Sequence, residues 1–212
     1  MERDIIIEKY NDFILTNGKK PNNVYSFSKQ IGIEEATFYK YFGSFEAIEK
    51  TIFTDLFNKT IEALNNNQDY LGYDAKTKLI SFYFTFFENL TTNRSIVFQI
   101  LNDSKWPTNS IKKLEGLKDC FKSYIKSLEI ESIQIPQVKL EDLKNKTITE
   151  LAWGQMLVTL KFWMEDESPS FEKTDIFIEK SLQASFDIVS LTPFKNILDL
   201  GKFLFKEKMG AK

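Results

Sequence analysis

The chain has 212 residues, of which 28 are basic and 30 are acidic, so its formal net charge of −2 gives it no general attraction for nucleic acid. It contains no histidine and a single cysteine, which excludes Ser-His-Asp and Cys-His catalysis, histidine-ligated metals and an intramolecular disulfide. Glycine (8) and proline (5) are scarce and hydrophobic residues reach 42%, a composition that favours a globular fold of long helices.

Apolar residues recur at helical spacing near the start of the chain, which predicts three short helices followed by a longer one. The predicted spans are about 3–16, 25–30, 34–41 and 44–64. We expect Gly18 to end the first helix, Gly32 to form a tight turn with positive φ between the second and third, and Ser44 to cap the fourth.

The rest of the sequence predicts longer and more aromatic helices, at about 74–91, 94–103, 109–129, 139–165, 170–190 and 194–208. Ser168-Pro169 and Thr192-Pro193 each have the pattern of an N-cap followed by proline at the first helical position. The stretch from Leu79 to Leu90 is apolar nearly all round, so its helix should be central in a bundle. These patterns predict an all-α fold of about nine to ten helices, with a three-helix head (residues 1–45) on a larger helical-bundle body (residues 46–212).

Two short helices joined by a glycine-containing turn, after an amphipathic helix, form a helix-turn-helix. This part of the chain resembles the TetR family of bacterial transcriptional regulators, in which an Ile-Ala-x-x-Ala-Gly-Val turn precedes a recognition helix that ends Thr-(Leu/Phe)-Tyr-x-x-Phe. The matching positions are Phe27, Ser28, Ile31, Gly32 and Ile33 in the first half, then Thr37, Phe38, Tyr39, Phe42, Ser44 and Ile48.

The resemblance implies a homodimer whose two recognition helices enter successive major grooves of a palindromic operator in double-stranded DNA. Carried over by position, Thr37 and Lys40 would face base edges or phosphates, and the hydroxyls of the two tyrosines would donate to phosphates. The implied DNA-binding residues are Ser26, Lys29, Thr37, Tyr39, Lys40, Tyr41 and Ser44.

The family resemblance also implies a hydrophobic small-molecule effector bound in the body, where aromatic residues are frequent. A well-filled core and an aromatic-lined cavity both fit this composition, and Gln155 and Thr159 fit either a ligand contact or mutual hydrogen bonding. The candidate ligand-binding residues are Phe84, Phe87, Phe98, Phe121, Trp153, Gln155 and Thr159. Small residues between Ser181 and Ile188 mark a candidate dimer interface.

The first 50 residues carry 7 basic and 8 acidic side chains, so this segment has a formal charge of −1. The chain also has Glu34-Glu35 and Phe45 where the family usually has Ser-Lys and Lys. Because DNA affinity depends largely on Lys and Arg, a second interpretation stays open. In it the protein keeps a TetR-like fold, has lost DNA binding, and binds a lipid or another hydrophobic small molecule.

The predicted helix at 193–208 is basic and amphipathic, which is typical both of contact with an anionic membrane surface and of packing against the body or a partner subunit. No apolar run approaches the about 20 residues that span a bilayer, and no secretory signal is recognisable. We therefore expect a cytoplasmic protein. With neither a nucleotide-binding glycine loop nor a metal-ligand cluster in the sequence, we expect no enzyme activity, no cofactor and no metal.

Overall fold

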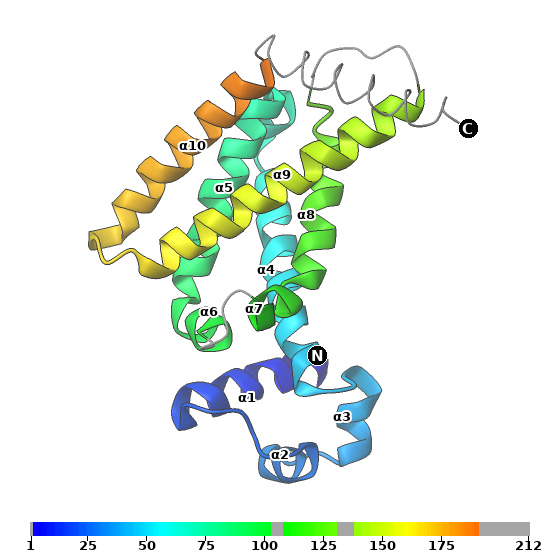
Figure 1. Cartoon of the computed structure of the whole chain (residues 1–212). Helices are drawn as coiled ribbons and strands as arrows, with labels where there is room; N and C mark the ends of the chain where they lie inside the picture. The colour runs from blue at the N-terminus through cyan, green and yellow to red at the C-terminus, as the bar shows by residue number, and fades with distance from the viewer. Residues whose placement is uncertain (1, 103–107, 131–137, 191–212) are drawn as a thin grey trace. The chain divides into compact units, whose positions relative to one another are not determined.

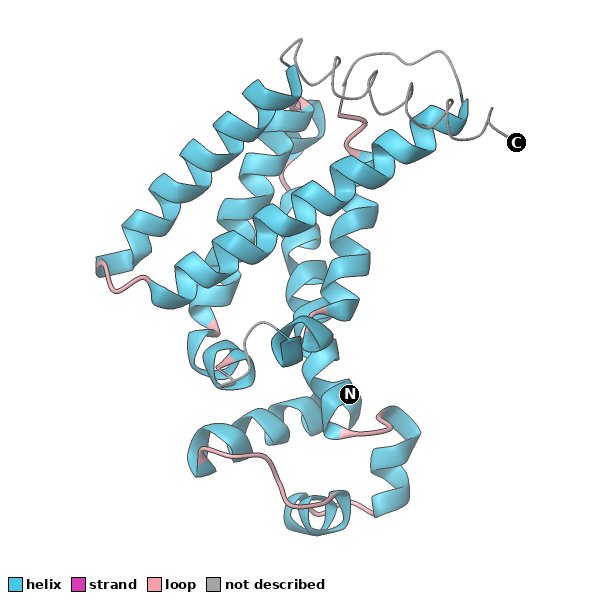
Figure 2. Ribbon diagram, viewed as in Figure 1, coloured by secondary structure: helices cyan, strands magenta, loops and turns pink. Residues whose placement is uncertain are grey.

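The computed structural model of the chain describes residues 2–102, 108–130 and 138–190. Within these ranges every regular element is a helix, so the all-α prediction is confirmed (Figures 1 and 2). The predicted helix at 194–208, the Thr192-Pro193 cap and any membrane contact through that segment lie outside the described residues. No helix of the described chain combines the length and apolar character that crossing a membrane requires.

The chain divides into two compact units. Unit 1 consists of residues 1–72 and 82–124, and unit 2 consists of residues 73–81 and 125–212, as far as these are described. The α-helices are α1 (Glu2–Asn17), α2 (Val24–Ile31), α3 (Glu35–Tyr41), α4 (Phe45–Asn65), α5 (Ala75–Thr92), α6 (Arg94–Leu101), α7 (Thr108–Lys113), α8 (Glu115–Ser127), α9 (Val138–Glu165) and α10 (Glu172–Ser190). Two short 3-10 helices, η1 (Gln68–Gly72) and η2 (Pro169–Phe171), precede α5 and α10.

The helix ends in the first 50 residues follow local capping chemistry, as predicted. Gly18 has φ +66° and its N–H donates to the Ile14 carbonyl at 2.8 Å, which ends α1. Gly32, at φ +76°, makes the turn after α2, in a backbone conformation that would strain a residue with a side chain. The hydroxyl of Ser44 accepts the N–H of Ala47 at 3.2 Å and caps α4.

One predicted helix is divided in the structure. The segment 109–129 forms two helices, α7 and α8, because the N–H of Leu114 bonds to the carbonyl of Ile111 rather than continuing the α-helical pattern. Gly116 then lies where α8 passes close to α4, and a Cβ atom there would be 2.6 Å from the Thr54 hydroxyl oxygen. The helical spacing of apolar residues in this segment did not predict the break.

Aromatic rings fill the core of unit 1, and α5 is central to it. Phe82 has ring-centroid distances of 5.4 Å to Phe57, 5.5 Å to Phe121 and 4.8 Å to Tyr124. The hydroxyls of Tyr124 and Tyr70 are 2.8 Å apart and satisfy each other at the edge of this cluster. The high phenylalanine content of the chain is therefore used in dense packing in this unit.

In unit 2, α9 packs against α10, and the rings of Phe162 and Phe177 stack at 4.5 Å with an angle of 9° between planes. The turn between the two helices is organised by Asp166. Its carboxylate accepts hydrogen bonds from the backbone N–H and hydroxyl of both Ser168 (2.8 and 2.6 Å) and Thr174 (2.9 and 2.7 Å). Burial raises the pKa of Asp166, but these hydrogen bonds outweigh burial and bring the pKa to about 2.

We expect Asp166→Ala to lower the free energy of unfolding by about 2 kcal/mol at pH 7. Because the pKa of the folded state lies below the unfolded value, the carboxylate stabilises the fold above about pH 4 and loses this effect as the pH falls toward 2. Urea denaturation at pH 7 and pH 3 measures both effects. Glu165→Ala, at an exposed neighbour, is the control, and an equal loss at both pH values for Asp166→Ala would contradict the assignment.

Candidate nucleic-acid interface

The first three helices and the start of α4 pack around Phe27, which has no exposed surface. Its ring meets those of Tyr10, Phe38 and Phe45 at centroid distances of 6.1, 6.3 and 5.5 Å. Phe45 also stacks on Tyr10 at 5.3 Å and is 9% exposed. This position, where the sequence departs from the TetR pattern, thus stabilises the packing of α1 through α4 rather than facing solvent.

Because this core buries one side of α2 and α3, the remaining positions of these helices are exposed. Ser26 and Lys29 on α2 and Tyr39 and Lys40 on α3 are all exposed, Tyr39 to 53%. Four of the seven residues predicted to bind DNA therefore lie at the surface of the helix-turn-helix. These side chains, with hydroxyl and ammonium groups, are of the kind that contacts phosphates.

The other three predicted residues are half-buried and have local roles. The Tyr41 hydroxyl donates to the Glu2 carboxylate at 2.8 Å, a bond that raises the pKa of Tyr41. Ser44 caps α4 through its hydroxyl. Thr37 lies in the first turns of α3, where its backbone N–H bonds to the Glu34 carbonyl at 3.0 Å.

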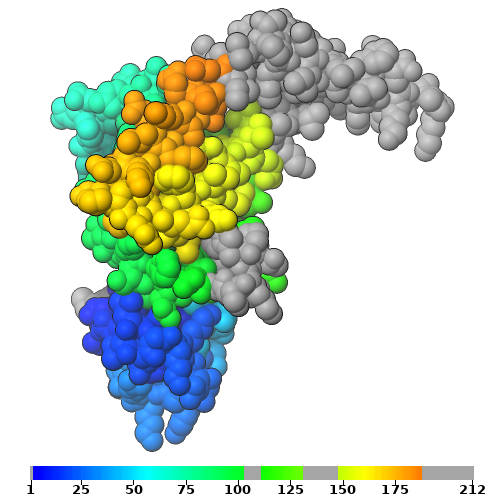
Figure 3. Space-filling model, turned by 60° about the vertical axis from the view of Figure 1, so that its left-hand side comes forward, coloured from blue at the N-terminus to red at the C-terminus, as the bar shows by residue number. Residues whose placement is uncertain are grey.

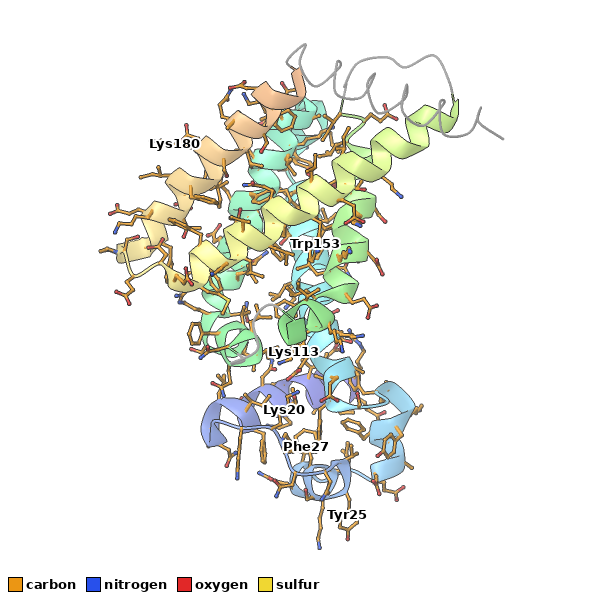
Figure 4. The ribbon with its side chains drawn as sticks, in the orientation of Figure 1. Lys20, Tyr25, Phe27, Lys113, Trp153 and Lys180 are labelled. Atoms are coloured by element: carbon orange, nitrogen blue, oxygen red, sulfur yellow. The ribbon has the colours of Figure 1, made fainter. Side chains whose placement is uncertain are left out.

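Tyr25, which the sequence reasoning did not select, is 60% exposed in the first turn of α2 (Figure 4). It precedes Ser26, and the side chain of Asn23 accepts the backbone N–H of Ser26 at 2.8 Å to cap the helix. Its position off the apolar stripe of α2 was the available signal. An exposed tyrosine beside a helix N-terminus can donate its hydroxyl to a phosphate.

The charges of the head are segregated by ion pairing. Arg3 bonds both carboxylate oxygens of Asp55 at 2.9 Å, and Lys20 pairs with two acidic residues of α4. Lys29 and Lys40 form no ion pair with any described residue. Although the head has no net positive charge, two of its unpaired cations therefore lie on α2 and α3.

The packing of α2 has one unfavourable feature, the hydroxyl of Ser28, which is buried and has no hydrogen-bond partner among the described residues. An unsatisfied buried hydroxyl costs free energy. We expect Ser28→Ala to raise the free energy of unfolding by about 1 kcal/mol, measured by chemical denaturation. Ser26→Ala, which removes an exposed hydroxyl bonded to the Asn23 carbonyl, should give no such gain, and a gain from both variants would contradict the explanation.

In unit 1, the predicted ligand-binding residues differ in their exposure. Phe87 and Phe121 are buried and both meet the ring of Tyr83, at 6.0 and 6.1 Å. Phe84 and Phe98 are instead 37% and 36% exposed.

The predicted ligand-binding residues of unit 2 all lie on α9. Trp153 is buried there (Figure 4). The amide of Gln155 donates to the Ser181 hydroxyl at 2.6 Å, and the Thr159 hydroxyl donates to the Gln155 carbonyl at 2.9 Å. The two polar residues are therefore satisfied within the α9–α10 pair.

Unit 2 also presents an apolar surface that the sequence reasoning did not identify, on α9 and α10 (yellow and orange in Figure 3). A groove of about 490 Å³ there is lined by Phe162, Lys173, Ile176, Phe177, Lys180 and Ser181. Leu151 and Val158 on α9 and Ile176 on α10 are 57%, 56% and 50% exposed. Exposed apolar residues beside an apolar groove on two packed helices are typical of a protein-protein interface.

Comparisons with known proteins agree with the architecture. A family profile described as "Tetracyclin repressor-like, C-terminal domain" matches residues 78–204. A TetR transcriptional regulator from Nitrosomonas europaea has a similar structure, with a TM-score of 0.60 and 14% identity over 86% of this chain and 96% of that chain. A putative TetR-family transcription regulator from a Shewanella species has a TM-score of 0.50 and 13% identity, over 88% and 96% of the two chains. No curated protein matches the sequence significantly.

Proposed function

The chain belongs to the tetracycline-repressor-like (TetR) family, and from that premise we propose that it is a DNA-binding transcriptional regulator that acts as a homodimer and responds to a hydrophobic small molecule. In this proposal residues 1–45 recognise DNA and residues 46–212 bind the effector and dimerise. The observation that carries the proposal is the helix-turn-helix of α2 and α3, with its apolar side in the core and its polar side exposed.

DNA recognition is assigned to the exposed side of the helix-turn-helix. α3 is the recognition helix, on which Thr37 and Lys40 contact base edges or nearby phosphates and Tyr39 donates its hydroxyl to a phosphate. Tyr41 and Ser44 contact the DNA backbone at the C-terminal end of α3 and the start of α4. On α2, the exposed Tyr25 joins Ser26 and Lys29 at the DNA backbone.

The homodimer is assigned to the apolar surface of α9 and α10. Val158 and Ile176 each expose at least half of their surface in the single chain. The groove on these helices adds apolar surface. A two-fold interface uses the same patch on both subunits, so one apolar surface is sufficient. The small residues between Ser181 and Ile188 lie further along α10 and allow close approach of a partner helix.

The effector site is assigned to the aromatic body. The candidate contacts in unit 1 are Phe84, Phe87, Phe98 and Phe121. In unit 2 they are Trp153 and the polar residues Gln155 and Thr159. Ligand entry would exchange the hydrogen bond between Gln155 and Ser181 for a contact with the effector. An effector regulates DNA binding only through different affinities for the two states of the dimer.

The proposal is tested by selecting duplex DNA from a random pool with the purified full-length protein at about 50 mM and about 200 mM salt. Enrichment of a palindromic sequence at both concentrations is the expected result, since it reports specific contacts by two heads. Enrichment of no sequence at either concentration would contradict it. That outcome, together with binding of a hydrophobic fluorescent probe to the same sample, would favour a TetR-like protein that binds a lipid or hydrophobic metabolite.

A further inference from the structure

Glu49, in the first half of α4, is a charged side chain with no exposed surface. Full burial of a carboxylate is rare in proteins, because removing the charge from water is unfavourable unless nearby groups compensate. The family pattern that the sequence matches does not include this position, and the DNA-binding face described above does not use it. The buried carboxylate therefore requires an explanation of its own.

Groups from three parts of unit 1 approach this carboxylate. The Tyr10 hydroxyl, on α1, donates to one oxygen at 3.1 Å, and the Lys20 ammonium, in the loop between α1 and α2, donates to the other at 3.0 Å. The Lys113 ammonium, on α7, is 3.8 Å from the second oxygen (Figure 4). Burial and the charge of Glu49 raise the pKa of Tyr10, so its hydroxyl remains a donor.

The loop that carries Lys20 is also held from α6. The side-chain amide of Gln99 donates to the carbonyl of Gly18 at 2.8 Å. Lys113 in turn donates to the carbonyl of Ile100 at the end of α6. The short loop between α1 and α2 is therefore fixed on one side by α4 and on the other by α6, and Glu49 and α6 share Lys113 as a common partner.

The loop matters because α2 begins at Val24, only four residues after Lys20. A chain this short transmits a shift of Lys20 directly to the start of α2, and α3 follows through the hydrogen-bonded turn at Gly32. Whatever holds Lys20 in place therefore contributes to the position of both helices of the helix-turn-helix.

We propose that Glu49 is a positioning residue for DNA recognition, whose buried carboxylate fixes the α1–α2 loop through Lys20 and links it through Lys113 to α7. The inference rests on the DNA-binding function proposed above. A charge is needed because the ammonium groups of Lys20 and Lys113 both approach this carboxylate, and Lys113 is largely buried, with Glu49 as its acidic partner among the described residues. Glu49 itself contacts no DNA and acts through the loop.

The test compares Glu49→Gln with Glu46→Gln. Both variants remove one negative charge from the same turns of α4, and both side chains contact Lys20, but Glu46 is exposed. General electrostatics predicts that either change tightens DNA binding, because each makes the head less acidic. Positioning predicts the opposite sign for Glu49→Gln alone.

We expect Glu49→Gln to weaken binding of the selected palindrome at least tenfold, with an unchanged salt slope, and Glu46→Gln to leave binding unchanged or tighter. Titration of labelled duplex at several salt concentrations measures both quantities. Equal or tighter binding by Glu49→Gln would overturn the inference.

Hydrogen exchange of the free protein gives a readout that does not depend on DNA. In the Glu49→Gln variant, the backbone amides of residues 18–31 should exchange at least tenfold faster than in the wild type. The exchange rates of residues 82–92 of α5 should not change. If Glu49→Gln does not fold, Lys113→Met replaces it in this test. Lys113→Met leaves the Lys20–Glu49 contact in place and should accelerate amide exchange in the same residues. Unchanged exchange in the loop overturns the inference even where DNA binds, whereas faster exchange without any DNA binding by the wild type contradicts the proposed function alone.

Discussion

The double variant Lys29→Ala, Lys40→Ala is expected to bind the operator about 10- to 100-fold more weakly near physiological salt. The slope of its binding constant against salt concentration should be lower by about 2. The two ammonium groups are exposed on α2 and α3 and form no ion pair with described residues. Each is therefore available to displace a counterion from a phosphate. Titrations of the selected palindrome at four or more salt concentrations give the affinity and the slope.

The matched control is the double variant Lys59→Ala, Lys126→Ala. It makes the same change in net charge at exposed positions of α4 and α8, outside the helix-turn-helix. We expect it to change affinity less than threefold and to keep the wild-type slope. Equal losses in the two double variants would mean that only the total charge matters, and the assignment of the DNA-binding face would then be wrong.

Val158→Glu should convert the dimer to a monomer at micromolar concentration and reduce palindrome binding more than tenfold. Val158 is 56% exposed on α9, so the substitution is tolerated in the single chain. In a two-fold interface it would bring two carboxylates into an apolar contact, where both charges are desolvated. Sedimentation velocity measures the mass, and DNA titration measures the loss of the second head.

Leu71→Glu is the control for this variant, since Leu71 is 66% exposed in η1, away from α9 and α10 in the sequence. It should leave both mass and affinity unchanged. A dimer that persists in Val158→Glu would place the interface elsewhere.

Much of the fold could be predicted from the sequence, because the relevant signals are local. The apolar stripe of Ile6, Tyr10, Phe13 and Ile14 predicted α1, and all of these side chains are buried except Phe13, which is half-buried. The turn at Gly32 and the cap at Ser44 depend on residues within four positions of each other, and both are confirmed. The TetR resemblance of about the first 60 residues agrees with the family profile that matches residues 78–204.

The functional sites were harder to predict, because a residue type does not reveal its spatial neighbours. The contact of Tyr41 with a phosphate stays a prediction, and the sequence did not show that its hydroxyl donates to Glu2, 39 positions away. Phe45 was a departure from the family pattern, and its ring is part of the core of the head. Both facts come from contacts between α1 and the α3–α4 region.

The sequence by itself determined that the chain is all-helical, where most helices begin and end, and that a helix-turn-helix lies near its start, since periodicity and capping act over a few residues. Only the tertiary structure decided which charges are buried or paired and which surfaces stay apolar. Glu49 meets Tyr10, Lys20 and Lys113 over separations of 29 to 64 positions. Such contacts are set by how helices pack, and packing depends on the complementary shapes of whole elements rather than on any one of them.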